Sequence, residues 1–428
     1  MTPRRKSLVR AVLAAAAAAL LAASPAPAAW TTPRTVALPP ASQGVSSLVA
    51  ATAGTGHTVA AWQQGTRTAP RLAYAVRSAS GDFGAARLIP HTSRGETIPR
   101  VGVSASGAAL IAYQEHLARG GFRVRVRSLS ATGQLGAPRT LSAPGHRAVS
   151  PSVAVNPRGD ALVTWRERGR SASAIYAVLR EGGRFGARQR LTGRAEQGAV
   201  VALDPGGGGI VAWLQDRGDH SEIWASLRPP GDVPAPPVRL EALPSSHPVV
   251  AAGGGTVFAA WSRGGNDISV RSGDPRATLG PPQRFVRPAT DLPTLAASPS
   301  GHAALGWTNA GYMDTPAAEL AVRAPGGDFG PPAAVLPPPA DSHLSSGAAA
   351  ASDRGDAAFG WRGQGWNVAV APPGAGAGPA VKLTTPDEEV GLGGLSLGLT
   401  DSGAAVAVWT SYLPASRREA VRAAYYAP

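Results

Sequence analysis

The chain has 428 residues, of which 53 are Gly and 40 are Pro, with 43% hydrophobic residues, 16% charged residues and no Cys. So many Gly and Pro residues exclude long helical bundles, because both types interrupt helices. The absence of Cys excludes disulfide scaffolds, Cys-ligated zinc and thiol nucleophiles. The formal net charge is +14, and nearly all basic residues are Arg spread along the chain. Without clustering beside aromatic platforms, this charge predicts no nucleic-acid partner.

Residues 1–28 have the layout of a secretory signal peptide. A basic segment, Met1 to Arg10, precedes an apolar run from Ala11 to Ala23, and small residues at 26–29 form a cleavage site. The apolar run is shorter than the ~20 residues that a membrane-spanning helix needs. We therefore expect a secreted, extracytoplasmic product that is not inserted in a membrane after cleavage. The adjacent Arg4 and Arg5 leave the export route, general or twin-arginine, open.

An internal repeat dominates the rest of the chain. An aromatic residue closes a short apolar run eight times, at intervals of 46 to 54 residues: Trp62, Tyr113, Trp165, Trp213, Trp261, Trp307, Trp361 and Trp409. A glycine precedes each of these anchor residues by six positions: Gly56, Gly107, Gly159, Gly207, Gly255, Gly301, Gly355 and Gly403. Because Gly adopts the positive φ that tight hairpin turns require, each pair indicates a β-hairpin.

Each repeat is interpreted as four short strands, named A to D in chain order. In the third repeat we expect strands at 152–156, 160–165, 174–179 and 185–191, separated by turns that contain Gly or polar residues. Four antiparallel strands in about 50 residues are typical of a β-propeller blade. We therefore predict an all-β fold with a single eight-bladed β-propeller over residues 30–428; seven blades is the alternative. The anchor aromatics are expected to pack between blades.

The two ends of the chain are predicted to close the ring together. The last repeat supplies strands at 395–400, 404–409 and 419–426 but lacks a fourth. Residues 30–36, with the sequence WTTPRTV, match the outer strand of the second repeat, LGAPRTL at 135–141. Pairing the N-terminal segment with the last three strands would leave no open blade edge.

The repeat unit resembles the TolB-like propeller repeat. The likeness lies in the turn Asn156-Pro157-Arg158-Gly159, the strand 175–178, a Gly-Gly turn and the sequence Arg-Leu-Thr at 190–192. This resemblance implies the fold and a role as a protein-binding platform, and a fold alone assigns no activity. Sialidase-type Asp-boxes place Trp two residues after Gly, whereas here the aromatic follows Gly by six. The Trp-docking motif of quinone-dependent dehydrogenases is also missing.

Candidate site residues follow from the strand order. The A–B and C–D turns lie on one face of a propeller, and the longer B–C loops and D–A connections lie on the other, which we call the loop face. We expect a ligand to bind there through Glu115, His116, Glu167, Asp216 and His220, with Trp366 as an exposed platform for a carbohydrate. No His-x-His or His-x-x-x-His spacing occurs, so we predict no metal site and no cofactor.

Two functional hypotheses remain open. The first is a monomeric, non-catalytic platform that binds a protein or a glycan through the loop face, with no catalytic residue assigned. The alternative is a carbohydrate-active enzyme, a glycoside hydrolase or lyase, with a carboxylate site at the channel mouth formed by Glu115, Glu167 and Asp216. Glycoside hydrolysis needs two carboxyl groups at a defined separation, which sequence does not provide.

Overall fold

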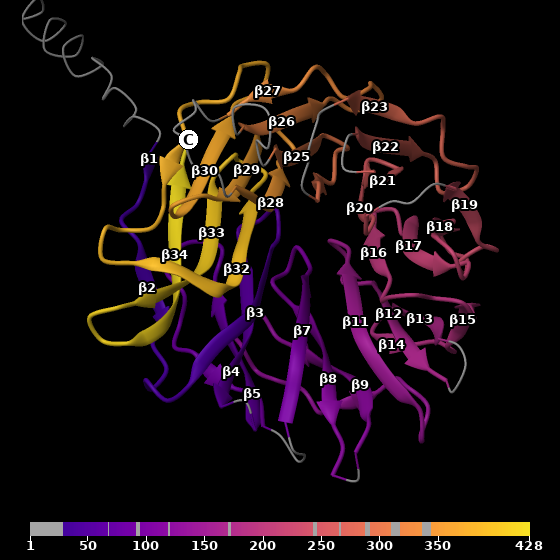
Figure 1. Cartoon of the computed structure of the whole chain (residues 1–428), viewed down its shortest axis with the longest axis horizontal. Helices are drawn as coiled ribbons and strands as arrows, with labels where there is room; N and C mark the ends of the chain where they lie inside the picture. The colour runs from indigo at the N-terminus through magenta and orange to yellow at the C-terminus, as the bar shows by residue number, and fades with distance from the viewer. Residues whose placement is uncertain are drawn as a thin grey trace, which may run out of the picture.

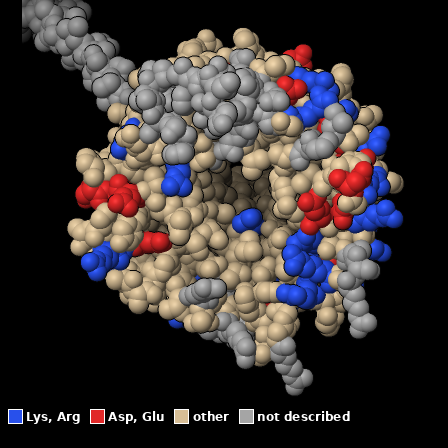
Figure 2. All heavy atoms as spheres, in the orientation of Figure 1, with Lys and Arg blue, Asp and Glu red and all other residues tan. Residues whose placement is uncertain are grey.

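The eight predicted repeats form a ring of eight sheets (Figure 1), with a central channel that is visible as a hollow in the space-filling view (Figure 2). The computed structural model describes residues 29–66, 68–90, 95–118, 120–169, 173–242, 246–264, 267–286, 292–309, 317–335 and 344–428; the predicted signal peptide, residues 1–28, lies outside them. The protein is an eight-bladed β-propeller of four-stranded antiparallel blades, so the predicted fold is confirmed and the seven-bladed alternative is wrong. The described residues contain no helix, and hence none able to span a membrane.

Strand A of each blade lines the channel and strand B lies next to it. The A strands are β3 (Gly44–Thr52), β7 (Gly95–Val103), β11 (Arg147–Val155), β16 (Val200–Leu203), β20 (Val249–Gly253), β24 (Thr294–Ala297), β28 (Ser345–Ala351) and β32 (Glu389–Leu399). The B strands are β4 (Thr58–Thr66), β8 (Ala109–His116), β12 (Ala161–Arg168), β17 (Gly209–Asp216), β21 (Thr256–Arg263), β25 (Ala303–Asn309), β29 (Ala357–Arg362) and β33 (Ala405–Leu413).

Strands C and D complete each blade towards the outside. The C strands are β5 (Ala69–Arg77), β9 (Phe122–Leu129), β13 (Ser173–Glu181), β18 (Ser221–Arg228), β22 (Asp267–Gly273), β26 (Ala317–Arg323), β30 (Trp366–Ala371) and β34 (Arg418–Ala427). The outer strands, two of them split, are β6 (Arg87–Leu88), β10 (Arg139–Thr140), β14 (Arg184–Phe185) with β15 (Gln189–Thr192), β19 (Val238–Glu241), β23 (Gln283–Val286), β27 (Ala333–Ala334), β31 (Val381–Lys382), and β1 (Ala29–Trp30) with β2 (Arg34–Ala37).

The repeated glycine and aromatic positions have the roles that their spacing predicted. All eight A–B turn glycines have a positive φ, between 74° and 96°, where a side chain would be strained. All eight anchor aromatics are fully buried. Trp213, for example, packs with Leu162 and Ile175 of the preceding blade. Each buried Trp contributes on the order of 150–250 Å² of hydrophobic contact, so the anchors hold neighbouring blades together.

The N-terminal segment closes the ring as predicted. Strands β1 and β2 both pair with β34, the third strand of the last blade, with Trp30 opposite Tyr426 and Arg34 opposite Ala423. The rings of Trp30 and Tyr426 also contact each other, with centroids 5.6 Å apart. The outer strand of blade 8 therefore comes from the opposite end of the described chain.

Hydrogen bonds link the A–B turns of neighbouring blades around one mouth of the channel. The amide of Asp401 donates to the carbonyl of Gly54 at 2.8 Å, and the amide of Ala105 donates to that of Pro157 at 3.0 Å. On the other side of the ring, Gly254 N donates to Pro299 O at 2.9 Å. These backbone hydrogen bonds connect neighbouring blades directly at this mouth of the channel.

The loop-face end of the channel is asymmetric around the ring. In blades 8, 1, 2 and 3 the residue fifteen positions before the anchor has a positive φ within a β-bulge: Gly394 at 94°, Ser47 at 52°, Ile98 at 54° and Ser150 at 53°. The A strands of these four adjacent blades have nine to eleven residues, against four to seven in the others. One half of the mouth thus has longer inner strands with local backbone strain.

Candidate functional site

The predicted site residues lie in four different blades. Glu115 and His116 end strand B of blade 2, Glu167 lies near the end of strand B of blade 3, and Asp216 and His220 flank the B–C loop of blade 4. Trp366 begins strand C of blade 7. None of the five acidic and histidine residues is on an inner strand. These residues therefore lie on the second and third strands of their blades or in the loops between them, and their grouping at the channel mouth stays a prediction.

Glu115 is fully buried and held by arginines of the adjacent strand. Arg125 Nη1 donates to Glu115 Oε1 at 3.0 Å, and Arg123 Nε donates to the other carboxylate oxygen. His116 is half-buried, with its ring edge-on to Phe122 at 4.5 Å, and burial lowers its pKa. This arrangement fixes a charged carboxylate inside the blade, which suits structural pairing better than proton transfer.

Glu167 accepts three hydrogen bonds, all at Oε1, although only 2% of its side chain is exposed. Its Oε1 accepts from Trp165 Nε1 at 3.0 Å, from Arg188 Nη1 at 3.2 Å and from the amide of Ala143 at 3.2 Å, and its Oε2 lies 3.3 Å from His146 Nδ1. Buried charges remain stable only when they are paired and hydrogen-bonded in this way. The carboxylate therefore links the anchor tryptophan to the outer strand of blade 3.

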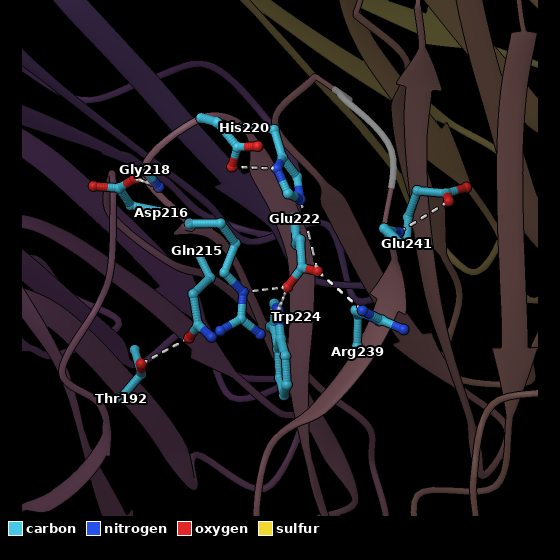
Figure 3. Close-up of polar contacts among 12 residues, drawn as sticks. Thr192, Gln215, Asp216, Gly218, His220, Glu222, Trp224, Arg239 and Glu241 are labelled. Atoms are coloured by element: carbon cyan, nitrogen blue, oxygen red, sulfur yellow. Dashed lines mark hydrogen bonds and ion pairs between the residues drawn. The ribbon is translucent and has the colours of Figure 1, made fainter.

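In blade 4 the centre of the polar cluster is Glu222, which sequence reasoning did not single out (Figure 3). Its carboxylate accepts from Arg217 Nε at 2.5 Å, Trp224 Nε1 at 2.8 Å and Arg239 Nη1 at 3.0 Å. His220 Nε2 lies 3.9 Å from the same carboxylate. Burial would raise the pKa of Glu222, but these hydrogen bonds outweigh it and lower the pKa to about 2. Glu222 is thus a carboxylate that stays ionised at neutral pH and binds two arginines.

The predicted residues of this blade surround that cluster. His220 Nδ1 pairs with Asp219 Oδ1 at 2.7 Å, and this contact, with the backbone, lowers the pKa of Asp219. Asp216 Oδ1 accepts from the amide of Gly218 at 2.7 Å and so shapes the turn. Asp216 is exposed and remains accessible to a ligand.

A recurring rule connects these contacts and could have been found in the sequence. Because side chains two residues apart share one face of a strand, an acceptor placed there can reach the indole N–H of a buried Trp. Such pairs are Trp62 with Gln64, Trp165 with Glu167, Trp213 with Gln215, Trp224 with Glu222 and Trp409 with Ser411. The acidic members of these pairs, Glu167 and Glu222, therefore accept hydrogen bonds from tryptophans of their own blades.

The prediction that Trp366 is an exposed platform is wrong. Only 4% of Trp366 is exposed, and its indole Nε1 donates to Thr410 O of blade 8 at 3.3 Å. It packs in the same cluster as Leu395 and Trp409. The residue that seemed to lie in a Gly-flanked loop is the first residue of strand C, where it fills the space between two blades.

A second repeated contact was also missed. An arginine at or near the end of strand C donates to the carbonyl of the A–B turn glycine in its own blade: Arg77 to Gly56, Arg180 to Gly159, Arg228 to Gly207 and Arg323 to Gly301. The separation of 21 or 22 residues between donor and acceptor is a signal that the sequence contained. These arginines stabilise the turns on the face opposite the loop face.

A cavity of about 300 Å³ occupies the channel at the A–B turn mouth, opposite the face where we expected the ligand. All eight blades line it, largely with small apolar residues and prolines. Two carboxylates from adjacent blades, Asp353 and Asp401, also line it. Burial and the neighbouring Asp353 raise the pKa of Asp401, while Asp353 Oδ1 accepts from the amide of Ser300 at 2.7 Å. In the described part of the chain, no group of three or more His, Asp or Glu residues is arranged to hold a metal ion.

Fold and site together define an eight-bladed β-propeller whose loop-face carboxylates are paired within single blades. No protein-family model and no curated protein matches the sequence. Solved propellers match in fold: the BP39L lectin of Burkholderia pseudomallei is 12% identical with a TM-score of 0.50, covering 82% of this chain and all of the lectin chain. The propeller domain of the Trilobed protease of Pyrococcus furiosus is 9% identical with a TM-score of 0.45, covering 75% and 92%.

A third solved structure is also similar to this chain. The alpha-L-arabinanase of Penicillium chrysogenum is 14% identical with a TM-score of 0.38, covering 65% of this chain and 93% of the enzyme. At these identities the likeness shows the fold alone. The resemblance to TolB-like repeats likewise holds at the level of the propeller fold.

Proposed function

We propose that the protein is a secreted, non-catalytic propeller that binds a glycan through its loop face. The observation that supports this proposal most is that carboxylates of the loop face are buried and already hydrogen-bonded to arginines. Glu115, Glu167 and Glu222 are each buried and hydrogen-bonded to arginine within one blade. A general acid must release a proton near the working pH, whereas Glu222 has a pKa of about 2.

The test uses the chain from residue 29 onwards on a panel of immobilised glycans, with turnover measured on the same panel. We expect saturable binding without release of reducing ends or unsaturated products. The variant Asp216→Asn, at an exposed position of the loop face, should change affinity, whereas Asp232→Asn, in an exposed turn of the opposite face, should not. Failure of every glycan to bind would contradict the proposal.

A second candidate function, a carbohydrate-active enzyme, is favoured by Asp353 and Asp401. Paired carboxylates with separated pKa values are the usual acid–base arrangement of glycoside hydrolases. Here Asp401 would be the acid, since burial and the neighbouring Asp353 raise its pKa. Turnover of any glycan that Asp401→Asn abolishes would establish this function and overturn the first.

A further inference from the structure

Basic side chains gather at the loop-face mouth of the channel, beside blades 2 and 3. Figure 2 shows Lys and Arg atoms next to the central hollow, over the part of the ring that β11 and β12 occupy in Figure 1. Among the eight inner strands, only β7 and β11 contain basic residues, Arg100 and Arg147. The adjoining strand β12 adds Arg166 and Arg168. These four residues are called the mouth arginines below.

Two of the mouth arginines are forced together by the strand register. Arg147 of β11 is directly opposite Arg168 of β12, and Val149 is opposite Arg166. Like charges at opposed positions of an antiparallel pair are destabilising. Burial lowers the pKa of Arg166, and the nearby positive charge of Arg168 lowers it further. The folded protein thus maintains an unfavourable concentration of positive charge at this point.

No ion pair joins a mouth arginine to a described carboxylate, although the charge of Glu196 acts on Arg166 and opposes the lowering of its pKa. Glu115 is engaged by Arg123 and Arg125, and Glu167 by Arg188. Among the described residues, Arg100 donates to a neutral backbone carbonyl, Pro99 O, at 2.9 Å, and Arg166 donates to Glu196 O. Arg147 lies over the ring of Phe122, 5.4 Å from its centroid, and Arg168 forms no ion pair with a described carboxylate. The excess positive charge is therefore available to a ligand.

The positions of the mouth arginines suit a chain of anionic groups. In blade 2, Arg100 is opposite Ala112. When the strands of blades 2 and 3 are compared position by position, this level is two residues deeper in the channel than the level of Arg166. At the rise of a strand, two residues correspond to about 7 Å. Arg147 and Arg168 are exposed at the surface. Guanidinium groups bind carboxylates and sulfates through paired hydrogen bonds. Successive charges on one flexible ligand can therefore contact the surface pair and the deeper arginine.

We propose that the mouth arginines bind an anionic polysaccharide, one that carries uronate carboxylates or sulfate groups. The proposal rests on the proposed glycan-binding function and specifies its ligand class. A glycan is favoured over a nucleic acid because base recognition needs exposed aromatic platforms. Here Phe122 is covered by Arg147 on its face and by His116 at its edge, and Trp366 is buried.

Binding of soluble polygalacturonate, dextran sulfate and neutral dextran to the chain from residue 29 onwards tests this proposal. The test variant is Arg147→Gln/Arg168→Gln, which changes two exposed residues whose side chains form no hydrogen bond with another described residue. The matched control is Arg184→Gln/Arg284→Gln, which removes the same charge from exposed positions on outer strands of blades 3 and 5. Arg100→Gln tests the deeper contact.

We expect one or both polyanions to bind, with affinity falling about tenfold or more in the test variant and less than twofold in the control. Affinity should also fall as salt rises, because charges at the surface are screened. Preference for polygalacturonate would identify carboxylate as the recognised group, and preference for dextran sulfate would identify sulfate. An equal loss in the control, or equally tight binding of duplex DNA, would overturn the proposal.

The outcomes separate this inference from the proposed function. Binding of neutral dextran or another neutral glycan, unaffected by Arg147→Gln/Arg168→Gln, would refute the polyanion while leaving a glycan-binding propeller. Absence of all glycan binding would refute both. The far-ultraviolet circular dichroism and melting temperature of each variant verify that folding is retained.

Discussion

The stabilising role of the buried carboxylates can be measured at two matched tryptophans. Trp165 and Trp261 are both 0% exposed anchors, in blades 3 and 5. Trp165 Nε1 donates to Glu167 Oε1 at 3.0 Å, whereas Trp261 Nε1 has no acceptor among the described residues. Trp→Phe removes the same atoms at each site, so the cost of the cavity is similar, and the difference reports the hydrogen bond of Trp165 together with the relief of the unpaired N–H of Trp261.

A hydrogen bond to a charged group contributes roughly 1.5–3 kcal/mol. Because Glu167 keeps the amide of Ala143 and Arg188 after the change, the lower end applies. We expect Trp165→Phe to reduce the free energy of unfolding by about 1.5 kcal/mol more than Trp261→Phe does. Denaturant unfolding followed by circular dichroism measures both, and Glu167→Gln in each background completes a double-mutant cycle. Equal costs for the two Trp variants would refute the structural role assigned to the carboxylate.

Three further predictions concern closure, charge and turns. Deleting residues 29–37 should lower the melting temperature sharply, since β34 loses both of its partners on that side, and a peptide of residues 29–38 should restore it; an unchanged melt would contradict ring closure. Because the pKa of Glu222 is about 2 in the folded protein, its stabilisation is complete above its ordinary pKa near 4.5 and is lost as the pH falls towards 2. The difference in melting temperature between Glu222→Gln and the parent should therefore shrink from pH 5 to pH 2. A difference that stays constant over this range would argue against stabilisation by the ionised carboxylate. Arg228→Met should cost about 2–3 kcal/mol, because Arg228 is 1% exposed and binds both Gly207 O and Glu181, whereas the half-buried Arg77→Met should cost about 1 kcal/mol. Parallel denaturant titrations measure the free energy of unfolding of both variants. A larger loss in Arg77→Met than in Arg228→Met would exclude burial as the cause.

The sequence was sufficient for the fold because its signals are local and repeated. A glycine six residues before a buried aromatic defines the A–B hairpin in every blade, and eight copies fix the ring. The site was harder to predict because the partners of its carboxylates come from other strands. Arg125 reaches Glu115 through the register of strand C with strand B, and Arg188 reaches Glu167 through the pairing of strand D with strand C. Trp366 was misplaced for a related reason: its burial depends on blade 8, far away in the sequence.

Backbone strain and unpaired positive charge occur in the same part of the ring. Ser150, with a φ of 53°, lies in the bulge of β11, the strand in which Arg147 is opposite Arg168. Ile98, with a φ of 54°, is two residues before Arg100 in β7. Each feature is unfavourable in the free protein, and a bulge redirects the side chains around it. An anion bound between the arginines would remove the repulsion but not the strain. The polyanion should therefore raise the melting temperature of the parent more than that of Arg147→Gln/Arg168→Gln, in proportion to its occupancy.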